Sequence, residues 1–160
     1  VNPDTDDMAV VVGTDQHKCI DDVYKVYFHL RKSNPNLRLS IIGDKESIPH
    51  HVLKDPRVVA KGVLSQSDVC YLLRRSKYYI TSTVIENSFN AASEGVFLAQ
   101  ESFISDIGPH RELLEGANFE RLDNLETRVA CLHVKRADIH PRNLKSWDQV
   151  IGEMVNIVID

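Results

Sequence analysis

The sequence predicts a three-layer α/β domain in which a parallel sheet of about six strands carries helices on both faces. Short apolar runs of strand length alternate with segments of helical periodicity along the chain, a pattern typical of βαβ units. No internal repeat, low-complexity stretch or linker interrupts this alternation, so we expect residues 1–160 to form one domain. Right-handed crossovers between parallel strands leave few arrangements of such a sheet.

The first half of the chain contains three predicted strands and one long helix. Residues 8–12 (MAVVV) form an apolar run that ends at Gly13, which is typical of a buried strand. Apolar side chains recur at helical spacing over residues 20–32 and predict an amphipathic helix. Further strands are expected over residues 37–42 (LRLSII) and around residues 57–60.

The second half of the chain continues the alternation. We expect, in order, a helix over 67–75, a strand over 77–81, a helix over 87–99 and a strand over 102–105. A short helix should run from Pro109 to Glu115, because proline suits the first helical turn, where its missing N–H is not needed. Two more helices, over about 124–136 and 145–158, would complete the domain.

Composition and missing motifs argue against several classes of function. The net charge of −4 offers no general case for binding nucleic acid or an anionic membrane surface. The three cysteines form no CxxC pair, so neither a disulfide framework nor a zinc site is indicated, and a reducing compartment is expected. The first strand is followed by GTDQHKC rather than GxGxxG, and the chain has no P-loop motif. A dinucleotide dehydrogenase and a P-loop NTPase are therefore not supported.

The predicted strand ends favour a ligand site at one edge of the sheet. In open parallel sheets, ligands bind beyond the carboxyl ends of the strands. Glycine or small polar residues mark most of these ends, at Gly13, Gly43, Gly62 and residues 81–86. A turn alone explains each glycine, but helices begin at the same edge, and their free N–H groups bind phosphate.

The stretch ENSFNAASE, residues 86–94, gives this edge a specific chemistry. If a helix begins near Asn87, Glu86 lies just outside its N-terminus and Glu94 lies roughly 9 Å further along the axis. The backbone N–H groups between the two carboxylates belong to Ser88, Phe89 and Asn90. Carboxylates accept hydrogen bonds from hydroxyls, and amides donate to phosphate. A nucleotide sugar, with its sugar, diphosphate and ribose, would therefore bind to the first carboxylate, the amides and the second carboxylate in turn. The plainer interpretation is a capped helix with acidic side chains near its positive end, which suits Glu86 better than Glu94.

The spacing Glu86-x7-Glu94, after a strand and a small polar run, resembles the donor-site motif of family-four glycosyltransferases of the GT-B architecture. Other segments of the chain are similar to that family in the same order: VVGTDQHKCID, LRLSIIGD, VVAKGVLSQSDVCYLLRRSKYYITST, SDIGPHRELLEG and SWDQVIGEMVNIV. The resemblance implies the Rossmann-like, C-terminal half of a GT-B fold, which binds the nucleotide-sugar donor.

The resemblance also implies roles for individual residues. Glu86 would contact the donor sugar and Lys18 would neutralise the diphosphate, which makes these two the residues nearest the chemistry. Glu94 would bind the ribose hydroxyls and Leu64 would lie against the base. The rest of the donor site would be Gly13, Asn87, Ser88, Phe89 and Asn90. Enzymes of this family retain the anomeric configuration and need no metal or other cofactor.

At the level of the whole protein, the resemblance implies transfer of a sugar to a glycan or lipid-linked acceptor in bacterial surface polysaccharide biosynthesis. A separate N-terminal half would carry most of the acceptor site, so we expect the chain alone to transfer no sugar. The expected location is the cytoplasm, with any association with the inner face of the membrane made through the missing half. No nucleic acid partner is expected.

The chain departs from the family pattern at the phosphate site. Thr14 stands where an arginine is usual and Cys19 where a glycine is common, so His17 or Arg111 would have to supply the missing cation. Two other functions therefore remain open. One is a non-catalytic GT-B-like module that binds a protein partner, and the other is an unrelated nucleotide-binding α/β domain.

Overall fold

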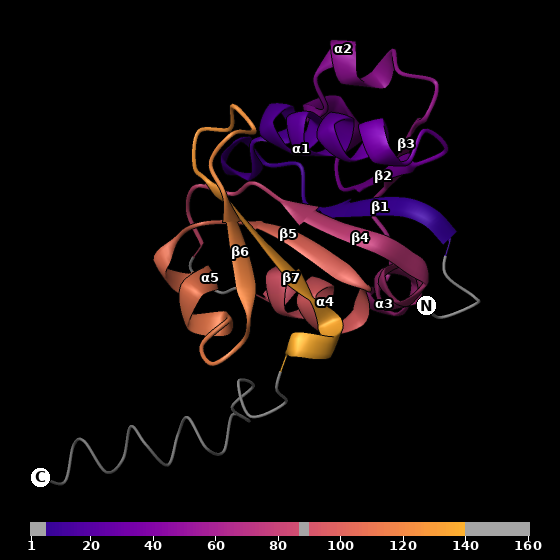
Figure 1. The fold of residues 1–160 in the computed structure, drawn as a ribbon. Helices are drawn as coiled ribbons and strands as arrows, with labels where there is room; N and C mark the ends of the chain where they lie inside the picture. The colour runs from indigo at the N-terminus through magenta and orange to yellow at the C-terminus, as the bar shows by residue number, and fades with distance from the viewer. Residues whose placement is uncertain (1–5, 87–89, 140–160) are drawn as a thin grey trace, which may run out of the picture.

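The computed structural model describes residues 6–86 and 90–139. Its centre is a seven-stranded sheet with the strand order β3-β2-β1-β4-β5-β7-β6 (Figure 1). The strands are β1 (Asp6–Val12), β2 (Arg38–Ile42), β3 (Val58–Gly62), β4 (Ser76–Thr81), β5 (Glu101–Ser105), β6 (Phe119–Leu122) and β7 (Cys131–Lys135). The first five strands pair in parallel, and β7 pairs antiparallel with both β5 and β6.

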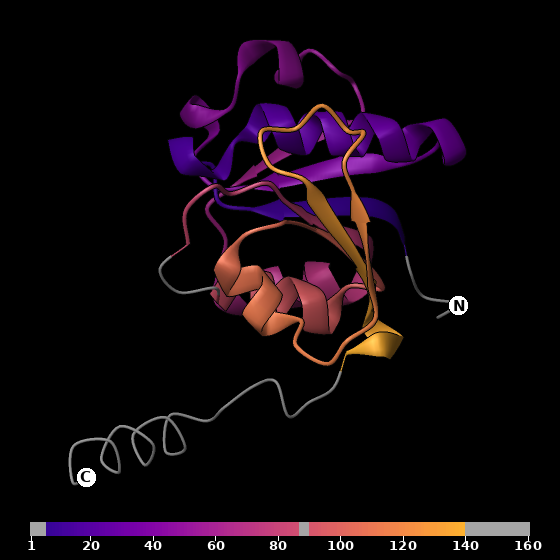
Figure 2. The same ribbon diagram turned by 60° about the vertical axis from the view of Figure 1, so that its left-hand side comes forward.

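Helices cover both faces of the sheet, which confirms the predicted three-layer α/β architecture. One face carries α1 (Ile20–Ser33) and α2 (His50–Leu53). The other carries α3 (Gln66–Arg75), α4 (Asn90–Leu98) and α5 (Gly108–Leu113), as the turned view in Figure 2 also shows. Three short 3-10 turns complete the described elements: η1 (Gln16–Lys18), η2 (Lys45–Ser47) and η3 (Arg136–Asp138).

The alternation of side chains along β1 builds the core on both sides of the sheet. Ala9 and Val11 are buried with the side chains of α1, whereas Met8 and Val10 are buried with those of α3 and α4. Because both faces are covered, the central strand is apolar throughout its middle, as expected of a parallel sheet.

The strand order reverses between β1 and β4. The chain builds β1, β2 and β3 outward in one direction, and then α3 returns it to the other side of β1. The chain segments that leave the carboxyl ends of β1 and β4 therefore run toward opposite edges of the sheet. Open α/β sheets bind ligands at such a topological switch point.

The prediction of a helix over 124–136 is wrong, because that segment contains β7. The sheet accordingly has seven strands where about six were expected. Leu125, Val129 and Leu132 have helical spacing, but Leu132 and Val134 face the α3–α4 core while Cys131 faces the α1 core. Pairing with β5 and β6 on both sides overrides the local periodicity, because it satisfies the backbone of the strand. The helix predicted over 145–158 lies outside the described residues.

The other predicted elements agree with the structure within a few residues, whereas α2 and β6 were not predicted. The helix that contains Pro109 ends at Leu113 rather than at Glu115. The described part of α4 begins at Asn90, and the predicted start of this helix near Asn87 lies outside the described residues.

Close contact with β4 fixes the position of α4. A Cβ atom at Gly95 would lie 2.1 Å from the ring of Tyr79, which is far inside van der Waals contact. Glycine therefore lets α4 pack directly on the aromatic ring. This packing sets the height of Glu94, one residue earlier, above the sheet.

Candidate functional site

The side chain of Lys18 reaches the carboxyl end of the sheet across the backbone of Gly13. Gly13 follows β1 with a φ of +95°, a conformation that favours glycine. A Cβ atom at this position would lie 3.2 Å from Cε of Lys18. Gly13, predicted as a site residue, therefore provides both the turn and the space for the lysine stem.

Lys18 and Glu86 form an ion pair at the switch point. Nζ of Lys18 lies 3.0 Å from Oε2 of Glu86, and the two side chains are only 12% and 10% exposed. An ammonium carries three N–H donors, and a carboxylate has about four acceptor positions, so this contact uses only part of the capacity of each group. The pair therefore offers both a cation and an anion to a polar ligand.

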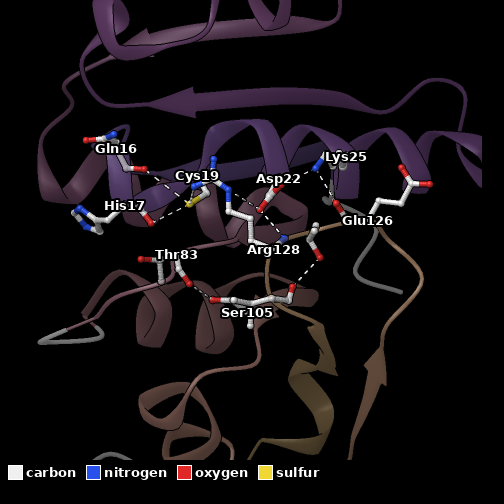
Figure 3. A network of polar contacts seen from close by, with 11 residues as sticks. Gln16, His17, Cys19, Asp22, Lys25, Thr83, Ser105, Glu126 and Arg128 are labelled. Carbon is white, nitrogen blue, oxygen red and sulfur yellow. Dashed lines mark hydrogen bonds and ion pairs between the residues drawn. The ribbon is translucent and has the colours of Figure 1, made fainter.

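Backbone contacts hold both partners of the ion pair. The amide of Val84 donates to the carbonyl of His17 at 3.1 Å, which joins the Glu86 loop directly to η1. The hydroxyl of Ser105, at the end of β5, donates to the carbonyl of Thr83 at 2.6 Å (Figure 3). The loop before Glu86 is thus bound on one side to the Lys18 turn and on the other to β5.

A second group of predicted site residues lies between α3 and α4. Nε2 of Gln66, the first residue of α3, donates to Oε1 of Glu94 at 2.5 Å. Leu64, two residues before Gln66, is half-buried and packs against the core under α3 and α4. The structure therefore brings the Leu64 loop beside Glu94.

The side chain of Tyr79 is buried beneath α4, where Gly95, the residue after Glu94, packs on its ring. Burial is the main cause that raises the pKa of Tyr79, and the negative charges of Glu86 and Glu94 raise this pKa further. Asn90 is exposed at the start of the described part of α4, and Asn87, Ser88 and Phe89 lie outside the described residues.

The two departures from the family pattern, at Thr14 and Cys19, have structural explanations. Thr14 is 5% exposed, and its hydroxyl donates to the carbonyl of Asp44 at 3.0 Å, which ties the loop after β1 to the loop after β2. Cys19 has a φ of +51°, in the left-handed region that favours glycine. Thr14 is therefore a structural residue, and the backbone at Cys19 has the conformation that the resemblance associates with glycine.

Arg111, one of the two residues expected to replace the arginine of the family pattern, forms a bidentate ion pair with the carboxylate of Asp106. Its Nη2 lies 2.7 Å from Oδ2 of Asp106, and its Nε contacts Oδ1 of the same side chain. Nε of Arg121 also lies 3.0 Å from Oδ2 of Asp106. The carboxylate of Asp106 therefore holds two guanidinium groups at the end of β5. His17, the other candidate, contributes to the site through its backbone carbonyl, which accepts a hydrogen bond from the amide of Val84.

A polar network that sequence reasoning missed anchors the loop between β6 and β7 to the start of α1 (Figure 3). The buried carboxylate of Asp22 accepts hydrogen bonds at 2.9 Å from the backbone N–H of Arg128 and from Nζ of Lys25. Lys25 also donates to the carbonyl of Glu126 at 2.7 Å. The loop is thus fixed a few residues from the Lys18 turn.

His110 is a second residue that sequence reasoning missed. It is fully buried in α5, and its Nδ1 lies 2.8 Å from the carbonyl oxygen of Ser105. Burial is the main cause that lowers the pKa of His110. A histidine between apolar helical positions is a weak sequence signal, and only the structure places this ring behind the Glu86 loop.

The fold and the site define a Rossmann-like α/β domain with a shielded ion pair at its switch point. A scan against protein-family models finds no match, and a search of curated proteins finds no significant similarity. Among the described helices, none combines the length and the apolar character that crossing a membrane requires.

Proposed function

We propose that the chain is the donor-binding domain of a retaining glycosyltransferase and that it binds a nucleotide diphosphate sugar. The observation that carries the proposal is the ion pair of Lys18 and Glu86, shielded at the point where the sheet reverses its strand order. A sugar diphosphate needs a cation for its phosphates and an acceptor for its hydroxyls, and this pair supplies both.

In this proposal, the diphosphate takes over part of the hydrogen bonding of Lys18. Its ammonium remains next to Gly13 and neutralises the phosphate charge, while the carboxylate of Glu86 accepts hydrogen bonds from the sugar hydroxyls. Glu94 would bind the ribose and Leu64 the base, and the hydrogen bond from Gln66 to Glu94, which brings the loop of Leu64 beside this carboxylate, supports the assignment. No metal or further cofactor is required.

The full-length protein would transfer the sugar to a glycan or lipid-linked acceptor, in the biosynthesis of a surface polysaccharide. This step needs the N-terminal half, so the chain alone would bind the donor without transferring sugar. The setting is the cytoplasm, where the N-terminal half would approach the inner face of the membrane.

A second candidate is a non-catalytic module of the same fold that binds a protein partner. Val63 and Ile85 are 84% and 61% exposed, and they follow β3 and β4 at the edge of the proposed site. Exposed apolar side chains at this edge suit either the missing half or a separate partner. The structural role of Thr14 favours this candidate further, since that position supplies no cation.

Thermal denaturation with UDP, GDP, ADP and CMP separates the two candidates. A nucleotide at 100 times its dissociation constant adds about 2.7 kcal/mol of stability, which is roughly 5–10 °C for a chain of this size. We expect such a shift with one base and its loss in Glu94→Ala. Glu112→Ala, at an exposed glutamate of α5, is the matched control and should keep the shift. No shift with any nucleotide up to millimolar concentration would favour the partner-binding module.

A further inference from the structure

His110 occupies a position that ordinarily takes an apolar side chain. Its exposure is 0%, and it lies in α5 near Leu113 and the following Leu114, which are also buried. A buried imidazole must find partners for two ring nitrogens or lose free energy. The ring has partners at Nδ1, and its Nε2 has no hydrogen-bond partner among the described residues. A role in packing alone does not explain a polar ring at this position.

The contacts of Nδ1 determine the protonation of the ring. Nδ1 lies 2.8 Å from the backbone carbonyl oxygen of Ser105, which can only accept a hydrogen bond. Nδ1 therefore carries the proton. Because burial lowers the pKa of His110, the ring is neutral at pH 7 and its Nε2 holds a lone pair.

The hydroxyl of Ser105 extends this contact in one direction. Its only proton is donated to the carbonyl of Thr83 at 2.6 Å. Since this hydroxyl oxygen has no other proton to donate, it can only accept from Nδ1 of His110, 3.2 Å away, and the single N–H of the ring is shared between it and the carbonyl oxygen of Ser105. The hydrogen bonds therefore run from His110 through Ser105 to Thr83.

Thr83 lies in the loop that leads from β4 to Glu86. Its own hydroxyl donates to the carbonyl of Ile85 at 2.7 Å, which closes the turn just before Glu86. The charge of Glu86 raises the pKa of His110 and that of Lys18 lowers it, so the ring senses both members of the ion pair. His110 thus stands behind the ion pair and at the start of the hydrogen-bond chain that holds it.

We propose that His110 is a positioning residue of the site. Through Ser105 and Thr83 it holds the loop after β4 so that Glu86 meets Lys18 and the ligand, and the ring itself contacts no ligand. The identity of the ligand in this inference rests on the proposed nucleotide-binding function, whereas the effect on the loop does not.

Two substitutions separate the roles of the two ring nitrogens. In His110→Asn, the side-chain amide can take the place of Nδ1–H and donate to Ser105. In His110→Gln, the amide instead reaches the place of Nε2. We expect the affinity for UDP or GDP, measured by calorimetry, to stay within about threefold of wild type in His110→Asn and to fall about tenfold in His110→Gln.

Ser105→Ala tests the same chain without changing the ring. It should weaken nucleotide binding about as much as His110→Gln, and the double variant should lose no more than either single variant, because both break one chain of hydrogen bonds. Ser105→Ala also provides the test if His110→Gln does not fold. Additive losses would overturn the proposal.

A readout without nucleotide keeps the inference separate from the proposed function. In NMR spectra of the free chain, the amide signals of Val84, Ile85 and Glu86 should shift and exchange faster in His110→Gln and in Ser105→Ala but not in His110→Asn. Unchanged signals in all three variants would overturn the inference even if wild type binds nucleotide. Binding that survives in His110→Gln and is lost in His110→Asn would show direct contact through Nε2 and would also overturn it. If wild type binds no nucleotide, the proposed function fails while the amide signals still decide the role of His110.

Discussion

Lys18 and Glu86 are 68 positions apart in the sequence, yet their charged atoms lie 3.0 Å from each other and both side chains are largely shielded from water. The contact is a consequence of sheet topology. Lys18 follows β1 and Glu86 follows β4, and these two strands are neighbours although two other strands separate them along the chain. The site is therefore assembled where the fold itself changes direction.

Removing one partner of this ion pair should destabilise the protein more than removing both. Lys18→Met or Glu86→Leu leaves one shielded charge without a partner, at a cost of about 3 kcal/mol in the free energy of unfolding. The double variant should cost less than either single variant, because no unpaired charge is left. Urea unfolding of the four proteins measures the coupling, and additive effects would show that the two charges do not depend on each other.

Much of the fold could be predicted because its signals are local. The apolar run over residues 8–12 reflects a strand buried on two faces, and it forms β1. The helical spacing over residues 20–32 reflects a helix buried on one face, and it forms α1. The strand β7 could not be predicted from its own segment. Its extended conformation depends on pairing with β5 and β6, which the local sequence pattern does not indicate. Only nonlocal pairing distinguishes such a strand from a helix of similar composition.

The candidate site was predicted only in part for the same reason. Glu86, Lys18 and Gly13 could be singled out because the sequence around them resembles a known motif and because glycine and small polar residues mark the strand ends. The role of His110 depends on a ring that packs behind a loop from another strand, and the contact of Asp22 with Arg128 joins positions 106 residues apart. Both contacts arise from the packing of distant segments, so no residue spacing in the sequence predicts either of them.

The buried ring of His110 should make folding stability depend on pH below 6.5. Burial depresses the pKa of His110 in the folded state from its ordinary 6.5, so the unfolded chain takes up this proton first. The contribution of the neutral ring is therefore fully present above pH 6.5 and is lost as the pH falls toward the folded pKa. Unfolding measured between pH 5 and pH 7.5 should show this loss in wild type and not in His110→Asn.

Two comparisons isolate this effect. His50→Asn, at an exposed histidine of α2, should keep the pH dependence of wild type. The hydrogen bond with His133 is the main cause that lowers the pKa of Glu101, so the stability that this carboxylate contributes is present above its ordinary pKa of 4.5 and is lost only at lower pH. Equal slopes in wild type and His110→Asn between pH 5 and pH 6.5 would contradict the prediction.

Gly95→Ala should destabilise the protein although alanine is the better helix former. In an open helix this change would add about 1 kcal/mol of stability. Here the new Cβ atom would lie 2.1 Å from the ring of Tyr79, and α4 would have to move away from β4. We expect a net loss of about 2 kcal/mol in chemical denaturation. Ser93→Ala, two residues earlier in the helix, is the control, and an equal gain in both variants would contradict the contact.

Asp22 and Arg128 should differ sharply in their effect on the loop between β6 and β7. The side chain of Asp22 is 3% exposed and accepts from the backbone of Arg128, whereas the guanidinium of Arg128 is 66% exposed and lies 3.9 Å from the same carboxylate. Asp22→Ala should therefore cost about 3 kcal/mol and speed hydrogen exchange at the amide of Arg128. Arg128→Ala should cost less than about 1 kcal/mol, because its backbone N–H still reaches Asp22 and an exposed ion pair contributes little. Equal losses in the two variants would show that the side chain of Arg128, and not its backbone, fixes the loop to α1.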